Sequence, residues 1–252
     1  MPLIESESIV LNSLKLGESD RLVTFYSKKL GKIKAVAKGA RKLKNKFGSS
    51  LEPFTYGRLV IYDKNSRFLY RLHQSDTIES FQILRSDYEK ILESARFSIC
   101  IDSLSPEGDP SVSVFNLFLN YLGRLKSERN TAGIIPLYQV KLLGYCGYAF
   151  CLERCVKCKG ELSEVRMAPI LGGMVCSGCF RSDPGNSFPV TPAAWAVLKQ
   201  ISKMNDDLLA RIRPTSDVSG EIARLIDIFI FHLLGKKLPS LQNFGVGRSS
   251  GW

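Results

Sequence analysis

Four cysteines in two closely spaced pairs are the side chains of this sequence best suited to hold a metal ion. Cys155 and Cys158 form one CxxC pair, and after 17 intervening residues Cys176 and Cys179 form a second. Each pair can turn tightly enough to direct two thiolates at one tetrahedral ion, and the spacer lets the two turns face each other. The spacing predicts one Zn²⁺ ion, while an iron–sulfur cluster or a redox dithiol pair remains open.

Four thiolates would fill the coordination shell of zinc, so the predicted site is structural and not catalytic. We expect the ion to organise a short insert with little core of its own, at about residues 150–190. Cys151 lies just upstream and could replace one ligand. Cys100 and Cys146 fit better as small buried residues in apolar segments.

The second feature that could do chemistry is a basic run from Lys28 to Lys46, with nine Lys or Arg in 19 residues. Cations at this density favour contact with a phosphate backbone. The candidates for contact with DNA are Lys32, Lys34, Lys38, Arg41, Lys42, Lys44 and Lys46. The aromatic residues around the run could stack on bases, but we expect most of them to fill the core; they are Tyr26, Phe47, Phe54 and Tyr56.

No motif for catalysis accompanies these features. The sequence has no GxxxxGK[ST], no GxGxxG after a strand and no GxSxG. His73 and His232 lie in a predicted strand and a predicted apolar helix, where a lone histidine is usually structural. The Asp206-Asp207 pair does not make a two-metal nuclease site. We therefore expect a binding protein and not an enzyme, with a nuclease as a remote alternative.

The charge of the chain also favours a polyanionic partner. The 252 residues have a formal net charge of +11, of which residues 1–80 carry +7. Nucleic acid is the natural partner of such a surface, although a solubilising surface would look the same. The N-terminus has two glutamates where a signal peptide is basic, and no stretch reaches the about 18 apolar residues of a membrane span. We expect a cytoplasmic protein with no membrane contact.

Residues 8–80 show the period-two alternation of short strands. Strands are expected at 8–16, 21–29, 32–38, 55–63 and 67–74. Five strands in so short a segment suit a small closed barrel of the OB type, and an SH3-like barrel would give a similar pattern.

Beyond residue 80 the period becomes helical. Helices are expected at 87–104, 114–125, 135–148, 192–204 and 217–235. The predicted fold is therefore a multidomain α+β protein, with an OB-fold domain at 1–80 and a helical domain at 81–244 that contains the zinc insert. Residues 245–252 have no pattern and are expected to be a disordered tail.

Several of these segments together resemble the bacterial RecO family of recombination mediators. These segments are GESDRLVTFYSKKLGKIKAVAKGARK (17–42), SSLEPFTYGRLVIY (49–62), LLGYCGYAFCLERCVKCKGEL (142–162) and CSGC (176–179). The first of them and the cysteine element after a helical region are the most specific, since CxxC pairs alone occur in many families. TPAAWAVLKQI and the closing LPSLQNF are compatible with the C-terminal region of the family, so the similarity extends to Phe244.

The resemblance implies an OB fold, a helical domain and a zinc-bearing segment, although some members lack the cysteines. It also implies recombinational DNA repair in the RecFOR pathway. The expected activities are binding of single- and double-stranded DNA and strand annealing. With RecR, such a protein loads RecA on single strands coated by their binding protein, at the bacterial nucleoid. The alternative function is a zinc-ribbon transcription factor or RNA-associated factor, which would show sequence preference.

Overall fold

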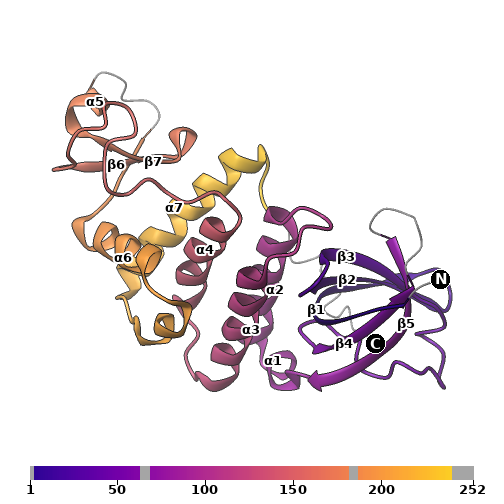
Figure 1. Cartoon of the computed structure of the whole chain (residues 1–252). Helices are drawn as coiled ribbons and strands as arrows, with labels where there is room; N and C mark the ends of the chain where they lie inside the picture. The colour runs from indigo at the N-terminus through magenta and orange to yellow at the C-terminus, as the bar shows by residue number, and fades with distance from the viewer. Residues whose placement is uncertain (1–2, 63–68, 182–186, 240–252) are drawn as a thin grey trace. The chain divides into compact units, whose positions relative to one another are not determined.

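The computed structural model describes residues 3–62, 69–181 and 187–239 of the chain (Figure 1). The chain divides into two compact units, Met1–Arg129 with Pro239–Trp252 and Asn130–Leu238. We call them the barrel unit and the helical unit. The predicted domain boundary at residue 80 follows the last barrel strand, whereas the compact units divide after Arg129. The predicted tail at 245–252 lies outside the described residues.

The barrel unit begins with a closed five-stranded barrel whose strands pair in the order β1-β2-β3-β5-β4 and then back to β1. All neighbours are antiparallel except β3 and β5, which run parallel. This closed five-stranded arrangement confirms the predicted barrel of the OB type. The strands are β1 (Leu3–Leu16), β2 (Asp20–Ser27), β3 (Gly31–Ala37), β4 (Tyr56–Tyr62) and β5 (Leu69–Glu79).

Strand β1 closes the barrel because it is long enough to pair with both β4 and β2. Its first half pairs with β4 and its second half with β2, and the register shifts between Val10 and Asn12. Val10 also exchanges backbone hydrogen bonds with the segment before β4, at 3.0 Å to Thr55 and 2.8 Å from Phe54. The sequence predicted the strand only from residue 8, because the first half buries the small polar Ser6 and shows no apolar alternation.

Apolar side chains from all five strands fill the barrel. They form one buried cluster with Ala40, Phe47 and Leu51 from the connection between β3 and β4. Three helices complete the unit: α1 (Gln82–Ser86), α2 (Tyr88–Leu104) and α3 (Val112–Ser127). Helices α2 and α3 both pack on β1, and the side chains of Asp87 and Ser111 cap their N-termini.

The helical unit contains α4 (Ile134–Tyr145), α6 (Pro192–Lys203) and α7 (Ser216–Leu234), with the short helix η3 (Asp206–Arg211) between the last two. Thr191 and Thr215 cap α6 and α7, and Gly235 ends α7 in the left-handed conformation. These helices confirm the predicted ones to within a few residues at each end.

The segment of residues 150–190, which we call the metal element, has a small sheet that the sequence did not predict. Strands β7 (Gly173–Cys176), β6 (Val165–Ala168) and β8 (Phe188–Pro189) are adjacent in that order. The element also contains the helices η1 (Pro169–Leu171) and α5 (Ser177–Arg181). Its strands have only four, four and two residues, which is too short to show a period. The indole of Trp195 on α6 donates to the carbonyl of Leu152 at 2.9 Å, which ties the element to the helices.

Candidate functional site

The four thiols of the two CxxC pairs come together in the metal element. The sulfur atoms of Cys155, Cys158, Cys176 and Cys179 all lie within 4.8 Å of one another. The Sγ atoms of Cys158 and Cys176 are 3.8 Å apart, and none of the four is in a disulfide. An ion with bonds of about 2.3 Å to four tetrahedral sulfurs keeps the sulfurs about 3.8 Å apart. The sulfur arrangement therefore fits one metal ion.

Backbone hydrogen bonds shape the two turns that carry these thiols. In the first turn the N–H of Cys155 donates to Gly160 at 3.0 Å, and the N–H of Lys159 donates back to Cys155 at 2.9 Å. Lys159 takes the left-handed conformation that this reversal needs. In the second turn Cys176 ends β7, and its N–H points at the sulfur of Cys155 at 3.4 Å.

The pKa values of Cys155 and Cys179 are shifted in opposite directions. Burial raises the pKa of Cys155, but backbone N–H donors from Cys158, Cys176 and Lys157 outweigh burial and bring it to about 6. A hydrogen bond with Cys158, together with burial, raises the pKa of Cys179 to about 12. The lowered pKa of Cys155 favours its thiolate, whereas the raised pKa of Cys179 favours its protonated thiol. A bound divalent cation would stabilise all four thiolates together.

The other three cysteines lie outside this group. Cys151 forms an isolated parallel β-bridge with Gly173. Its backbone N–H donates to the carbonyl of Gly172 at 3.0 Å, and its carbonyl accepts from the N–H of Met174 at 2.9 Å. A side chain at Gly173 would place its Cβ 2.6 Å from the carbonyl of Cys151, so that position requires glycine. Cys100 is buried in α2 as predicted, whereas Cys146, also expected to be buried, is only half-buried because it lies at the C-terminal cap of α4. Among the described residues, the four-thiol group is the only cluster of three or more potential metal ligands.

The basic run divides between a strand and a loop. Lys32 and Lys34 lie on β3, where acidic residues of the α2–α3 region face them. The ammonium of Lys32 donates to the carbonyl of Asp102 and lies 3.4 Å from its carboxylate. The ammonium of Lys34 lies 2.7 Å from the carboxylate of Glu107. The hydrogen bond from Gly108 N–H to the Lys32 carbonyl, at 2.9 Å, holds this acidic segment against β3.

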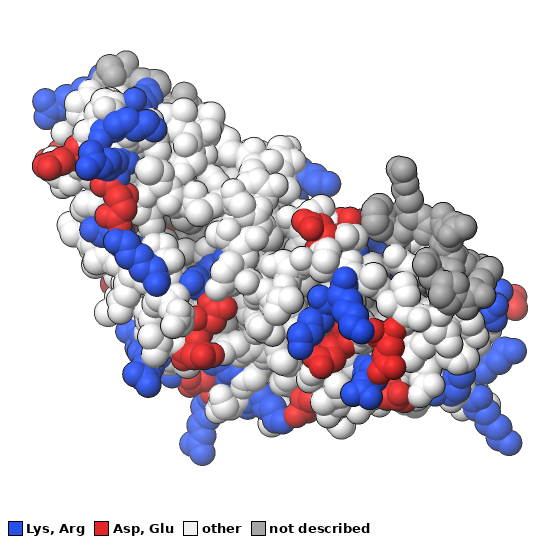
Figure 2. All heavy atoms as spheres, in the orientation of Figure 1, with Lys and Arg blue, Asp and Glu red and all other residues white. Residues whose placement is uncertain are grey.

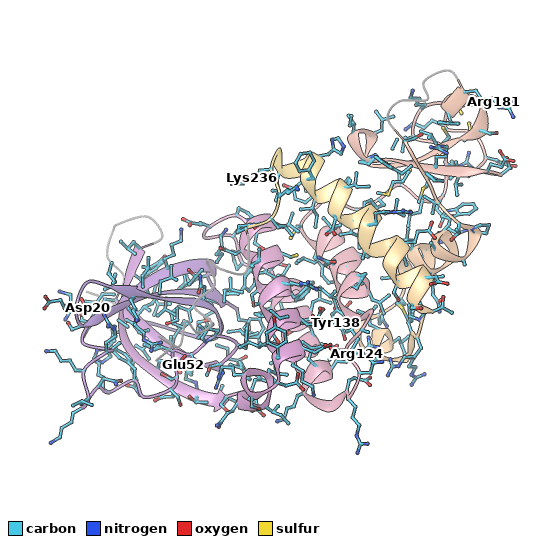
Figure 3. All side chains as sticks on the ribbon, turned by 180° about the vertical axis from the view of Figure 1, so that it is seen from behind. Asp20, Glu52, Arg124, Tyr138, Arg181 and Lys236 are labelled. Carbon is cyan, nitrogen blue, oxygen red and sulfur yellow. The ribbon has the colours of Figure 1, made fainter. Side chains whose placement is uncertain are left out.

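The other predicted cations lie on residues 38–46, which we call the basic loop. Lys38, Lys42 and Lys44 are exposed and form no ion pair with any residue that the structure describes. Lys and Arg side chains project from the surface of the barrel unit in Figure 2, and Figure 3 labels Asp20 in the same unit. Arg41 and Lys46 are also exposed, but they donate to the carbonyls of Gly17 and His73.

The basic loop rests on the turn between β1 and β2. The backbone N–H of Arg41 donates to the carbonyl of Ser19 at 2.9 Å, and that of Gly39 donates to Asp20 at 2.8 Å. The bond from Gly39, with one from the Ser19 hydroxyl, lowers the pKa of Asp20, and Lys38 contributes. This contact brings the exposed Lys15, at the end of β1, to the same end of the barrel. A single lysine far from the basic run gave no signal in the sequence.

The aromatic residues around the run serve the core. Tyr26, Phe47 and Phe54 are buried. Tyr56 is half-buried, donates to Glu7 at 3.1 Å and packs edge-on against Phe115 on α3. None of the four is therefore an open platform on which a base could stack.

The chain matches two family models that together cover almost all of it. Residues 1–81 match "Recombination protein O N terminal" and residues 85–242 match "Recombination protein O C terminal". The chain belongs to the RecO family. The two RecO models meet where the barrel strands end, and the second includes the four-thiol group.

Relatives named "DNA repair protein RecO" match over nearly their full length. The one from Pelotomaculum thermopropionicum is 33% identical over 249 residues, which cover 97% of this chain and 96% of the relative. Those from Thermodesulfovibrio yellowstonii and Clostridium novyi are 31% and 29% identical and cover 91% and 97% of this chain, and 93% and 94% of the relative. RecO membership places the chain among proteins of DNA repair and recombination.

The residues considered for catalysis have structural contacts. The Nδ1 atom of His73 lies 2.8 Å from the hydroxyl of Tyr62. Asp206 accepts a hydrogen bond from Tyr145 at 2.8 Å and lies 3.6 Å from the ammonium of Lys141. The RecO family is one of DNA-repair mediators and not a known class of enzymes. None of the described helices is long and apolar enough to cross a lipid bilayer.

Proposed function

We propose that this chain binds single- and double-stranded DNA, anneals complementary strands and mediates recombinational repair without catalysing a covalent step. Its partners are RecR and the single-stranded-DNA-binding protein, and through them it loads RecA on coated single strands. The place of action is the bacterial cytoplasm at the nucleoid, because the substrate is there. Membership of the RecO family supports the class of function.

The observation that carries the DNA-binding proposal is the basic loop. Lys38, Lys42 and Lys44 are exposed and form no direct ion pair with a described residue, although Lys38 and Lys42 lie near the charge of Asp20; the backbone of their loop is anchored to the barrel. OB folds bind oligonucleotides through the β2–β3 face and the loops beside it, including the β1–β2 turn on which the basic loop rests. Cations held there can bind phosphates without the cost of first ordering the backbone.

Annealing follows from the same charges. Two complementary strands repel each other through their phosphates, and cations that neutralise both strands lower this barrier. Base pairing then supplies the free energy, so no reacting side chain is needed. Binding of this kind depends little on sequence and falls steeply with salt.

The test is annealing of complementary single strands coated with their binding protein, with and without RecR. We expect the chain to speed annealing, and the rate to fall strongly as salt rises from about 50 to about 200 mM. Absence of annealing at low salt would exclude the proposed function. Affinity that changes little with salt would exclude the phosphate contacts.

We further propose that the metal is one Zn²⁺ ion with a structural role. Its ligands are Cys155, Cys158, Cys176 and Cys179, and four thiolates are a common donor set for structural zinc. Bound zinc would stabilise the thiolates and close the metal element, which has only a small apolar cluster around Cys155, Ala168 and Val175.

Metal analysis of the purified chain tests this proposal, and we expect one zinc per chain. Cys176→Ser should lose the metal and lower the thermal stability of the helical unit, while the matched variant Cys151→Ser should keep both. Iron in place of zinc would correct the identity of the metal. A full complement of zinc in Cys176→Ser would exclude the assigned ligands.

A further inference from the structure

Leu43, at the tip of the basic loop, is the most exposed large apolar side chain among the described residues. Its relative exposure is 105%, and the next is Tyr88 at 77%. Single exposed apolar residues are common on protein surfaces and need no explanation by themselves. Leu43 differs because exposed cations flank it on both sides, at Lys42 and Lys44.

The loop presents Leu43 on an ordered backbone. At its start Gly39 donates to Asp20 at 2.8 Å, and Lys42 N–H donates to Gly39 at 3.1 Å. At its end the Asn45 side chain donates to the carbonyl of Lys42 at 3.1 Å. The same side chain accepts from the N–H groups of the two residues that follow Lys46. Leu43 is thus held outward between two anchored turns.

A second apolar residue lies at the same end of the barrel. Leu16, at the end of β1, is 39% exposed and precedes the turn whose Gly17 carbonyl accepts from the Arg41 side chain at 2.9 Å. Lys15 beside it is also exposed. This end of the barrel therefore exposes both apolar and cationic side chains, beside the acidic Glu18 of the turn.

Phosphate contacts leave the bases untouched, and contact with the faces of bases needs an apolar or aromatic side chain. The aromatic residues near the run are buried or packed edge-on, so they cannot provide a stacking surface. Leu43 is the large apolar side chain of the basic loop that is available to bases. Proteins that kink duplex DNA frequently insert apolar side chains, leucine among them, between base steps.

We propose that Leu43 is an apolar wedge that inserts between adjacent bases of single-stranded DNA while the flanking cations hold the phosphates. The wedge would interrupt base stacking locally and leave base edges open to a second strand. Every base has an apolar face, so the contact is independent of sequence. The proposal rests on the proposed DNA binding by the basic loop and adds the residue that contacts bases.

The test compares Leu43→Ala with Leu43→Met, which restores a flexible apolar side chain, and with the control Ile83→Ala, which removes another exposed apolar side chain of the barrel unit. The probe is a single-stranded oligonucleotide that contains 2-aminopurine, whose fluorescence rises when its neighbours unstack. Affinity is measured over a series of salt concentrations. Because Leu43 is fully exposed, neither variant of Leu43 should lose stability.

We expect Leu43→Ala to lower the affinity for single strands about threefold to tenfold and to abolish the fluorescence rise. The salt slope should stay that of the wild type, because no phosphate contact is lost. Leu43→Met should restore both signals and Ile83→Ala should change neither. Wild-type fluorescence and affinity in Leu43→Ala would overturn the wedge while leaving DNA binding intact. If the wild-type chain does not bind the oligonucleotide, the proposed function itself fails.

Discussion

The strand β3 and the basic loop that follows it both carry cations of the basic run, and they differ in what surrounds those cations. Lys32 and Lys34 on the strand face Asp102 and Glu107, which lie about seventy positions later in the sequence. The loop cations Lys38, Lys42 and Lys44 face solvent in the described structure. One basic run therefore divides into a part that holds the fold together and a part available to a ligand.

This difference shows how a charge cluster is to be interpreted. Density of charge shows that cations lie close together in sequence, but it does not show whether an acidic segment covers them. Gly31 illustrates how closely the covering segment approaches, because a Cβ there would lie 2.2 Å from the carbonyl of Asp109. Because the α2–α3 segment packs this closely on β3, Lys32 and Lys34 form ion pairs within the fold and are less available to DNA.

The largest expected effect comes from reversing charges of the basic loop. The triple variant Lys38→Glu, Arg41→Glu, Lys42→Glu should bind DNA about a hundredfold more weakly, because three phosphate contacts become repulsive. The slope of log affinity against log salt should fall by about two to three. Fluorescence anisotropy over a salt series measures both quantities.

The double variant Lys32→Gln, Lys34→Gln is the matched comparison for the triple variant. Its DNA affinity should stay within about threefold of the wild type, since these cations already have acidic partners. Equal losses of affinity in the two variants would remove the distinction between strand and loop. A loss only in the strand variant would invert it.

A smaller effect, on stability, is expected at Lys32. Its side chain is only 11% exposed, and its ammonium contacts both the carbonyl and the carboxylate of Asp102. Lys32→Met keeps the buried stem and leaves the carbonyl of Asp102 without this donor, at a cost of about 1–2 kcal/mol in the free energy of unfolding. Urea unfolding measures the change, for which Lys44→Met serves as the exposed control. A Lys32→Met variant as stable as the control would show that this contact contributes nothing.

The ion pair between Lys34 and Glu107 should contribute less to the free energy of unfolding, because the two side chains are 42% and 34% exposed. A double-mutant cycle with Lys34→Gln and Glu107→Gln should give a coupling energy of about 0.5 kcal/mol. The exchanged pair Lys34→Glu, Glu107→Lys should recover part of the stability that either reversal loses alone. Coupling of zero would mean that backbone contacts alone hold the α2–α3 segment on β3.

The sequence predicted the features that depend on local spacing. The CxxC pairs identified the four thiols, because each pair fixes two ligands within one turn. The helices followed from their period and caps. The first half of β1 and the three-stranded sheet of the metal element were missed, because their buried residues show no apolar alternation.

The features that depend on tertiary packing could not be predicted in this way. Nothing near Lys34 in the sequence points to Glu107, and nothing near Arg41 points to the turn at Gly17. The aromatic residues of the run were expected mostly in the core, and Phe47 and Phe54 are buried there. Leu43 gave no signal among lysines, since only the folded loop shows that its side chain is exposed.

The smallest expected effect is a dependence of stability on alkaline pH. The hydrogen bond from Lys34 to Glu107 raises the pKa of Lys34, with a further contribution from the charge of Asp102. A raised pKa means that the folded state holds the proton more tightly, so the stabilisation is fully present below the unfolded pKa of about 10.4. It is lost as pH rises through the folded pKa. Solvent screening limits the effect to a few tenths of a kcal/mol.

The difference in unfolding free energy between the wild type and Lys34→Gln should therefore shrink above about pH 10.4, and Glu107→Gln should abolish this trend. If the difference in unfolding free energy stays constant across this pH range, the protonated Lys34 is not stabilised by Glu107. The strand cation would then resemble the loop cations, which have no direct acidic partner among the described residues.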